Sequence, residues 1–171
     1  HMRDGVRILD VGCGNGFSTI KFLTRFKGSQ AVGVDYSPAM VAAANLYLQR
    51  RSSFKTRLQF LVGDVLQLSQ LPALCGQKFD IIVSERCLIN LKNWSEQQVA
   101  LGEMKKMLSP NGRIVLCENI HEGLERLNQL RHAVELPPIT VRWHNFYFPE
   151  TKLLRFLKKN LCGVKQDAIQ S

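Results

Sequence analysis

ILDVGCGNGF, residues 8–17, is a short hydrophobic run that leads directly into a turn with glycine at positions 12, 14 and 16. Glycines at alternate positions let the backbone turn tightly and let a ligand approach without Cβ atoms in the way. They also present backbone N–H groups at the start of a helix, where an anionic group is favoured. The stretch therefore predicts a strand, a turn and a helix, with a ligand site at the turn.

The rest of the chain repeats this alternation of short apolar runs with longer stretches of helical spacing. We expect strands at 6–11, 30–35, 57–62, 79–84 and 112–118, and helices at 18–26, 38–51 and 95–108. Ser37 before Pro38, and Ser95 with Gln98, are typical of helix starts, and residues 109–112 are typical of a turn. The pattern predicts an α/β fold with a doubly wound, mostly parallel sheet.

The glycine spacing distinguishes two classes of ligand. A dinucleotide fingerprint is Gly-x-Gly-x-x-Gly, whereas here Phe17 occupies the position of the last glycine and Gly16 comes one residue earlier. Asp10 precedes the turn, where its carboxylate would repel a pyrophosphate but attract an ammonium group. A nicotinamide-dependent dehydrogenase is therefore disfavoured.

The glycine turn and four later stretches resemble the class I S-adenosylmethionine-dependent methyltransferases. DVGCGNG (10–16) is similar to the first motif of that family, and VGVDYSPAMV (32–41), FLVGDVLQL (60–68), FDIIVSERCLINL (79–91) and MLSPNGRIVLCE (107–118) follow in the family's order. The resemblance implies a Rossmann-like methyltransferase fold in which residues 1–171 form one domain. Residues 3–118 would be the cofactor-binding core and residues 119–171 the acceptor-side elements.

The resemblance also implies the cofactor, S-adenosylmethionine, and the residues that bind it. Asp35 would hold the two ribose hydroxyls, Asp64 would accept from the adenine amino group, and Ser84 and Glu85 would line the methionine end. The full implied set is Asp10, Gly12, Cys13, Gly14, Asn15, Gly16, Asp35, Tyr36, Met40, Gly63, Asp64, Val65, Ser84, Glu85 and Arg86.

The segment after residue 118 has a different character. Residues 121–136 can form an amphipathic helix that Pro137 and Pro138 end, and residues 143–148 crowd five aromatic or imidazole rings together. These rings suit either the wall of a pocket or packing into the core. A further helix is expected at 150–160, which leaves room for one strand in 161–171, so we expect the C-terminal strand pair to be incomplete.

Methyl transfer needs a base only if the acceptor must lose a proton. We expect His144 and His121 to be the catalytic residues, because imidazole can take a hydroxyl proton near neutral pH. A histidine held by a backbone carbonyl is the alternative for either residue. Arg142 is a candidate for binding an acidic group of the acceptor.

The acceptor class follows in part from what the fourth-strand loop lacks. Its Ser-Glu-Arg-Cys sequence is not the Asn/Asp-Pro-Pro-aromatic tetrad of the enzymes that methylate planar nitrogens, so methylation of a nucleic-acid base or an amide is disfavoured. The runs ERCLINL (85–91), LNQLR (127–131) and WHNFYF (143–148) resemble a bacterial subgroup of the family that modifies small molecules or surface saccharides, which implies such an acceptor for an O- or N-methyltransferase. The net charge of +9 keeps an RNA methyltransferase open. A catalytically silent S-adenosylmethionine-binding module is the other alternative.

Length and composition indicate where the protein acts and whether it binds a metal. The chain has 171 residues, and neither an apolar run of eighteen residues nor a signal-peptide pattern is present, so we expect a cytoplasmic protein that does not span a membrane. The leading His1 and Met2 resemble what a cleaved tag leaves. The five cysteines lack metal-binding spacing, which predicts small core residues and no metal site. The sequence does not define an oligomeric state.

Overall fold

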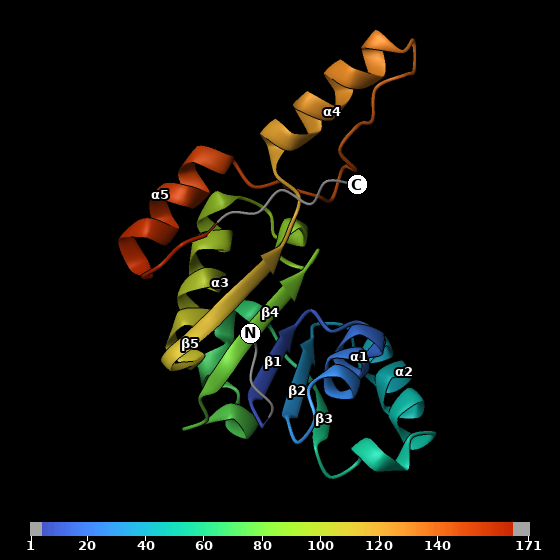
Figure 1. Ribbon diagram of the computed structural model, residues 1–171, viewed down its shortest axis with the longest axis vertical. Coiled ribbons are helices and arrows are strands. Elements are labelled where there is room, and N and C mark those ends of the chain that lie inside the picture. The colour runs from blue at the N-terminus through green and yellow to red at the C-terminus, as the bar shows by residue number, and fades with distance from the viewer. Residues whose placement is uncertain (1–4, 166–171) are drawn as a thin grey trace.

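A computed structural model of the chain describes residues 5–165 and contains one sheet flanked by helices (Figure 1). Five parallel strands lie in the order β3-β2-β1-β4-β5. The strands are β1 (Arg7–Val11), β2 (Gln30–Asp35), β3 (Leu58–Val62), β4 (Phe79–Glu85) and β5 (Leu108–Cys117). The helices are α1 (Phe17–Arg25), α2 (Pro38–Gln49), α3 (Trp94–Met107), α4 (His121–Ala133) and α5 (Glu150–Asn160), with short 3-10 turns η1 (Ser52–Phe54), η2 (Val65–Gln70), η3 (Pro72–Leu74) and η4 (Leu88–Asn90). The predicted doubly wound α/β fold is confirmed.

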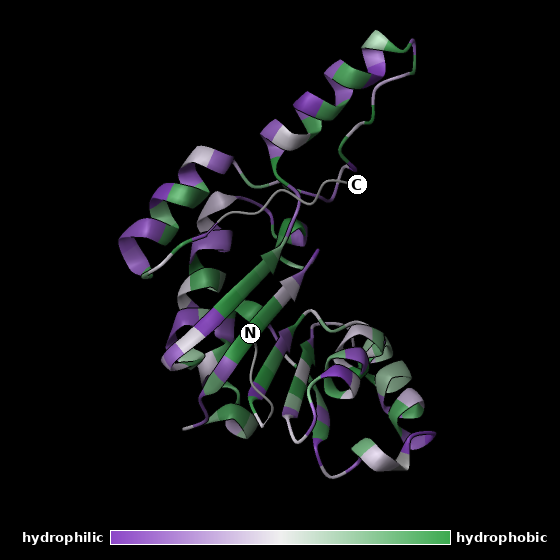
Figure 2. Cartoon of the chain, viewed as in Figure 1, coloured by the Kyte–Doolittle hydropathy of each residue, from purple (hydrophilic) through white to green (hydrophobic). Residues whose placement is uncertain are grey.

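The two faces of the sheet bury separate hydrophobic clusters. Because side chains alternate along a strand, Ile8 of β1 packs with apolar residues of α1 and α2, whereas Leu9 and Val11 pack with α3 on the other face. The strands are accordingly mostly hydrophobic, while hydrophilic and hydrophobic residues alternate along the helices (Figure 2). This double cover fixes the sheet and leaves the carboxyl ends of its strands open to loops, at the place where open α/β sheets bind ligands.

Several predicted boundaries shift for identifiable reasons. Helix α3 begins at Trp94 because the Asn93 side chain, not Ser95, accepts a hydrogen bond from the backbone N–H of Glu96 at 3.0 Å. The predicted turn at 109–112 lies inside β5 instead, where Asn111 has a φ of 64° and the pairing with β4 shifts register.

The two helices after β5 differ, because α5 packs on the core through Leu153 whereas α4 extends away from the sheet. Helix α4 has no buried residue and projects outward in Figure 1, and it ends at Ala133, before Glu135 with its φ of 55°. Residues 161–165 contain no strand, and the remainder of the strand predicted within 161–171 lies outside the described residues. Within residues 5–165 no helix combines the length and apolar character needed to cross a membrane.

The prediction that the cysteines are core residues is only partly correct. Cys13 is buried and Cys87 is half-buried, but Cys75, Cys117 and Cys162 are exposed. The exposed three lie in a loop, at the end of an edge strand and beyond α5, where no second layer covers them. Among the described residues no group of three potential ligands could hold a metal ion.

Gly33 in β2 provides a test of how tightly the sheet packs. A Cβ at this position would lie 2.6 Å from the ring of Phe60, its partner on β3, and 2.9 Å from the Cβ of Cys13. We expect Gly33→Ala to lower the free energy of unfolding by about 1–3 kcal/mol in urea denaturation, because a packed core resists added volume.

Gly102 in α3 is the matched control. A Cβ there meets nothing within 4 Å, so Gly102→Ala should raise the free energy of unfolding by about 0.5–1 kcal/mol through helix propensity. Equal effects of the two substitutions would contradict the close approach of Phe60 to β2.

Candidate active site

The glycine turn between β1 and α1 has a backbone that only glycine adopts freely at three positions. Gly12, Gly14 and Gly16 have φ values of 75°, 53° and 77°. The N–H groups of Gly12 and Cys13 donate to the carbonyl of Val34 at 2.8 and 3.1 Å, which ties the turn to β2. Gly16 is the N-cap of α1, so the predicted strand, turn and helix are present.

Two of these glycines also have neighbours that exclude a side chain. A Cβ on Gly12 would overlap the side chain of Cys87, and a Cβ on Gly16 would overlap the ring of Phe60. Gly14 differs, because nothing lies within 4 Å of the place where its Cβ would be. The turn is therefore closely packed against other side chains at Gly12 and Gly16, whereas Gly14 faces open space.

Asp10 lies directly before this turn and is a buried carboxyl with an altered acidity. Its side chain is 3% exposed and accepts a hydrogen bond from the Thr19 hydroxyl of α1 at 2.5 Å. Burial raises the pKa of Asp10 to about 6, and the nearby carboxylates of Glu85 and Asp35 act in the same direction, while the Thr19 bond opposes them. A cation placed beside Asp10 would favour the ionised form.

Asp35, at the end of β2, is held in place by two backbone donors. Its Oδ2 accepts from the N–H of Gly14 at 2.8 Å, and its Oδ1 accepts from the N–H of Ser37 at 2.9 Å. The carboxylate therefore lies against the glycine turn and beside the start of α2. Tyr36 and Met40 next to it are 78% and 48% exposed, which leaves apolar surface uncovered at this edge.

Asp64, after β3, caps the following 3-10 turn. Its Oδ1 accepts from the N–H of Leu66 at 2.8 Å, and it is half-buried together with Val65. Gly63 before it donates to the carbonyl of Asp35 at 3.0 Å, so the ends of β2 and β3 are linked. Asp35, Asp64 and Val65 thus lie at the carboxyl ends of two neighbouring strands. In the glycine turn, the Asn15 side chain accepts a hydrogen bond from the N–H of Phe17.

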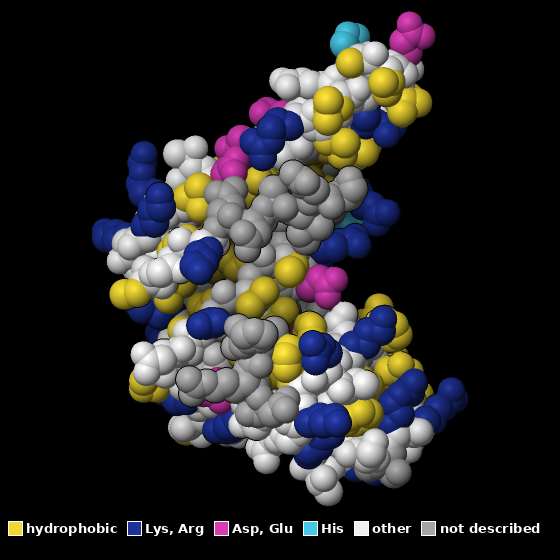
Figure 3. All heavy atoms as spheres, in the orientation of Figure 1, with side chains coloured by type: hydrophobic (Ala, Val, Ile, Leu, Met, Phe, Trp, Pro, Cys, Tyr) yellow, Lys and Arg dark blue, Asp and Glu magenta, His cyan; other side chains and the backbone are white. Residues whose placement is uncertain are grey.

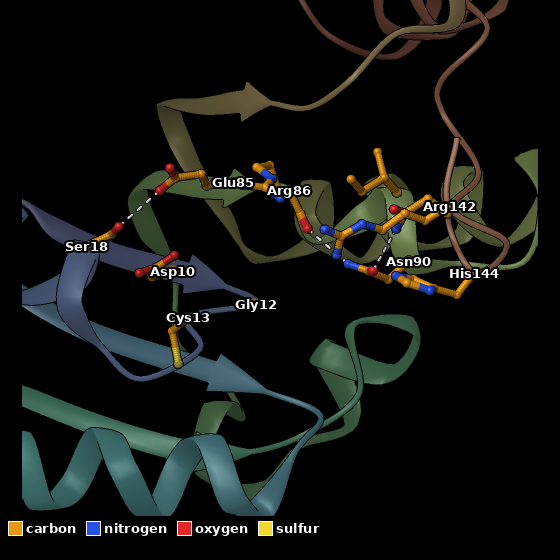
Figure 4. A pocket seen from close by; sticks show the side chains of 11 residues that line it. Asp10, Gly12, Cys13, Ser18, Glu85, Arg86, Asn90, Arg142 and His144 are labelled. Carbon is orange, nitrogen blue, oxygen red and sulfur yellow. Dashed lines mark hydrogen bonds between the residues drawn. The ribbon is translucent and has the colours of Figure 1, made fainter. Parts of the chain in front are cut away.

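A cavity of about 360 Å³ opens between the glycine turn and residues that follow β4 and β5. Figure 4 shows Asp10, Gly12 and Cys13 on one side and Arg142 and His144 on the other. The complete lining is Asp10, Gly12, Cys13, Ser18, Glu85, Arg86, Ile89, Asn90, Arg142, His144 and Asn145. The structure therefore brings predicted residues from both halves of the chain around one space.

The Ser84 side chain points away from the cavity, so a contact with the methionine end, as the resemblance implies, would have to come from its backbone. It is fully buried, is absent from the cavity lining, and donates its hydroxyl to Glu118 Oε1 at 2.6 Å. Glu118 also accepts from the N–H groups of Cys87, Leu88 and Ile89, which fixes the loop after β4. Burial raises the pKa of Glu118, and these hydrogen bonds oppose that rise.

The two candidate bases have different positions. Both histidines are exposed, but only His144 lines the cavity, whereas His121 lies at the start of α4 with its Nδ1 3.3 Å from Glu125. His121 is not part of the cavity lining. The ring-rich segment divides in the same way, since Phe148 is fully buried in the core and Trp143 is 95% exposed.

Gln97 of α3, which no motif in the sequence singled out, positions the segment around Phe146. Its buried side-chain amide donates to the carbonyls of Leu88 and Phe146 at 3.2 and 2.8 Å, and the N–H of Phe146 donates to the carbonyl of Ile89 at 2.7 Å. These bonds connect segments 49 residues apart in sequence, which no local pattern reveals. Four other residues line the cavity but were not predicted from the sequence: Ser18, Ile89, Asn90 and Asn145. Of these, only Ser18 lies where a helix-start pattern could have indicated it, in the first turn of α1.

Comparison with known proteins identifies the family. Residues 2–159 match the family model described as a methyltransferase domain. Demethylmenaquinone methyltransferase of Thermus thermophilus is 32% identical over 112 residues, which cover 66% of this chain and 46% of the relative. A ubiquinone/menaquinone biosynthesis C-methyltransferase of Dinoroseobacter shibae is 27% identical over 140 residues, 80% of this chain and 53% of the relative.

The fold recurs among solved structures. Magnesium protoporphyrin IX methyltransferase from Synechocystis, solved with bound S-adenosylhomocysteine, superposes with a TM-score of 0.68 at 21% identity and covers 92% of this chain and 64% of that one. The [4+2]-cyclase SpnF superposes with a TM-score of 0.65 at 22% identity, covering 93% and 52% of the two chains.

These matches define a class of protein. The chain belongs to the methyltransferase-domain family, and its sheet is the Rossmann-like fold of class I S-adenosylmethionine-dependent methyltransferases, as the sequence predicted. The chain spans about half the length of the curated relatives it matches.

The raised pKa of Asp10 predicts a specific pH dependence of stability. An unfolded Asp loses its proton near pH 4, whereas folded Asp10 loses it near pH 6, so the folded state binds more protons between these values. The contribution of Asp10 to stability is present below pH 4 and is lost as pH rises through 6, a change of about 3 kcal/mol. Urea denaturation across this range measures it.

Asp10→Asn is the control, because it keeps an acceptor for Thr19 and cannot ionise. The free energy of unfolding of Asp10→Asn, relative to that of the unsubstituted protein, should rise by about 3 kcal/mol between pH 4 and pH 7. A difference that stays flat over this interval would show that Asp10 ionises as it does in water.

Proposed function

We propose that this chain is the catalytic domain of an S-adenosylmethionine-dependent methyltransferase that acts on an oxygen or nitrogen atom of a small-molecule acceptor. The observation that carries the proposal is the cavity at the carboxyl ends of β1 and β4. There the glycine turn and the acidic residues Asp10 and Glu85 face a wall supplied by residues 142–145. This division supports residues 3–118 as the cofactor half and residues from 119 onward as the acceptor side.

The donors and acceptors of the site fit the amino-acid end of the cofactor. Asp10 and Glu85 line the cavity and can attract an ammonium group, and Glu85 Oε2 accepts from the Ser18 hydroxyl at 3.1 Å, which orients it. Asp10 is costly to ionise in isolation because it is buried, and a bound cation would offset that cost. The backbone of Gly12 and the open space at Gly14 leave room for close approach.

The nucleoside end fits a second set of residues. Asp35 lies beside the glycine turn, where a carboxylate suits two hydroxyl donors such as those of a ribose. Asp64 and Val65 follow β3 at the same edge, and the exposed side chains of Tyr36 and Met40 offer apolar surface to an adenine ring. We infer that this edge holds the adenosine and that the cavity holds the methionine end and the acceptor.

The chain's own contribution to the chemistry is alignment and proton removal. When bound, S-adenosylmethionine supplies an electrophilic methyl group attached to a sulfonium. The residues after β4 and β5 then have to orient the acceptor and keep water out. His144, which lines the cavity, is the base that takes the acceptor's proton at an imidazole nitrogen. His121 lies on α4 outside the cavity lining, so we assign it no role in proton transfer.

The size of the cavity and the location of the basic residues support a small acceptor over RNA. A volume of about 360 Å³ is in the range of small-molecule sites. The basic residues gather mainly in two places. One group, which includes Lys55 and Arg57, precedes β3 and so lies at the amino ends of the strands, away from the cavity, and the other lies on α5. The RNA alternative requires RNA affinity that falls steeply as salt rises, and gel-shift measurements at low salt test it.

The names of two similar proteins raise two alternatives to this proposal. The quinone-pathway relative of Dinoroseobacter is named a C-methyltransferase, so a carbon acceptor competes with oxygen and nitrogen. A cyclase shares the fold, so a domain that binds the cofactor without transferring methyl groups is the second candidate. In a screen of methyl-labelled S-adenosylmethionine against small-molecule, RNA and protein extracts, the absence of label from every fraction indicates the silent module. Where a product is labelled, NMR of its methyl group shows whether carbon, oxygen or nitrogen received it.

Asp35 provides the sharpest test of cofactor binding. We expect Asp35→Ala to weaken S-adenosylmethionine binding about 10- to 100-fold in calorimetric titration, because it removes the carboxylate proposed to accept hydrogen bonds from the two ribose hydroxyls. Unchanged affinity would refute the assignment of Asp35 to the ribose.

Glu125→Ala is a suitable control for that titration. Glu125 is an exposed carboxylate on α4 whose recorded partner is His121, so its removal changes the net charge equally. We expect the affinity of this variant to stay within about twofold of the starting protein. Circular dichroism of both variants separates lost binding from lost folding.

A further inference from the structure

The cavity has two walls of opposite character. Asp10 and Glu85 line the side next to the glycine turn, and Arg86, Arg142 and His144 line the side next to the loop after β4 (Figure 4). The space-filling view shows an indentation with Lys, Arg and His side chains along its upper edge and an acidic side chain within it (Figure 3). A ligand spanning the cavity therefore meets a cation-binding side and an anion-binding side.

Arg86 sits at the boundary in an unusual backbone conformation. Its φ is 51°, a value that costs a non-glycine residue free energy and that persists only when the surroundings impose it. The N–H of Arg86 donates to the carbonyl of Cys117 and its own carbonyl accepts from the Asn90 amide, both at 3.0 Å. These bonds fix the direction in which the Arg86 side chain leaves the chain.

Arg142 is carried by a turn that is fastened to the same loop. The N–H of Asn145 donates to the carbonyl of Arg142 at 2.9 Å, and the side-chain amide of Asn145 donates to Asn90 Oδ1 at 2.9 Å. The adjoining Phe146 is bonded to Ile89 through its N–H. The turn thus holds Arg142 over the cavity although its own side chain is exposed to solvent.

The guanidinium groups of Arg86 and Arg142 have no counter-ion in the described part of the chain. The ion pairs and side-chain hydrogen bonds within residues 5–165 include neither group, while Glu85, beside Arg86 in sequence, bonds Ser18 instead. A guanidinium presents a planar fork of donors that matches a carboxylate or a phosphate. Two such groups around one concave space create a complementary site for an anion.

We propose that Arg142, flanked by Arg86, binds an anionic group of the methyl acceptor, a carboxylate or a phosphate. This inference rests on the proposed methyltransferase function and specifies the acceptor's chemical class. Arg86 lies next to the cofactor side and is shared between the two ligands, whereas Arg142 belongs to the acceptor side. His144, two residues beyond Arg142, then faces the part of the acceptor that loses a proton.

The test uses protein saturated with S-adenosylhomocysteine, so that the cofactor's own carboxylate is already in place. Succinate, inorganic phosphate and the neutral succinamide are the probes, and calorimetry or ligand-observed NMR measures their dissociation constants. We expect at least one of the two anions to bind and succinamide to bind at least fivefold more weakly than that anion. The tighter of the two anions identifies whether a carboxylate or a phosphate is recognised.

Arg142→Gln and Arg155→Gln form a matched pair for this measurement. Arg155 is an exposed arginine on α5, so its substitution removes the same charge away from the cavity. Arg142→Gln should weaken anion binding at least fivefold, Arg142→Lys should weaken it less, and Arg155→Gln should change it less than twofold. Binding of S-adenosylhomocysteine itself should stay within twofold in all three variants.

Three results would overturn the inference: neither anion binds the loaded protein, Arg142→Gln leaves anion binding unchanged, or Arg155→Gln weakens it equally. Failure of the proposed function has a different signature, because S-adenosylhomocysteine would then not bind the unsubstituted chain at all. Circular dichroism of Arg142→Gln, and the intermediate affinity expected for Arg142→Lys, distinguish a binding defect from misfolding.

Discussion

The structure depends on the close fit of the glycine turn between Phe60 and Cys87. Gly12 and Gly16 have positive φ values and no room for a Cβ, so the turn can pass between β1 and α1 only with these residues. Phe60 of β3 is paired with Gly33 of β2, and its ring packs against both Gly33 and Gly16 of the turn. Because Cys87 follows β4, the same contact packs the glycine turn against the loop after β4, and both segments line the cavity.

Electrostatics gives this rigid turn its chemical character. Asp10 is buried at the end of β1 with a pKa raised to about 6, and Asp35 is fixed against Gly14 by a hydrogen bond. Across the cavity, Arg86 and Arg142 lack counter-ions among the described residues. The fold therefore separates negative and positive groups across one small space, which suits a cationic cofactor beside an anionic acceptor.

The arrangement of the strands and of the glycine turn could be predicted from sequence because its signals are local. The glycine spacing, the strand ends at Asp35 and Asp64, and the alternation of elements each occur within a few residues, and the fold confirms the arrangement they predicted. The position of the segment after β5 depends on contacts between distant residues, such as Gln97 with Phe146, which have no local pattern. For the same reason, sequence could not separate His144 from His121, or show that Ser84 faces Glu118.

Proton release on cofactor binding tests the central claim, that the buried carboxyl before the glycine turn receives a cation. The measurement is calorimetric titration of the chain with S-adenosylmethionine at pH 6, in two buffers with different ionisation enthalpies. We expect one-to-one binding with release of up to about half a proton, because Asp10 is half-protonated at that pH and a cation favours its ionised form. Absence of binding, or binding with proton uptake, would contradict it.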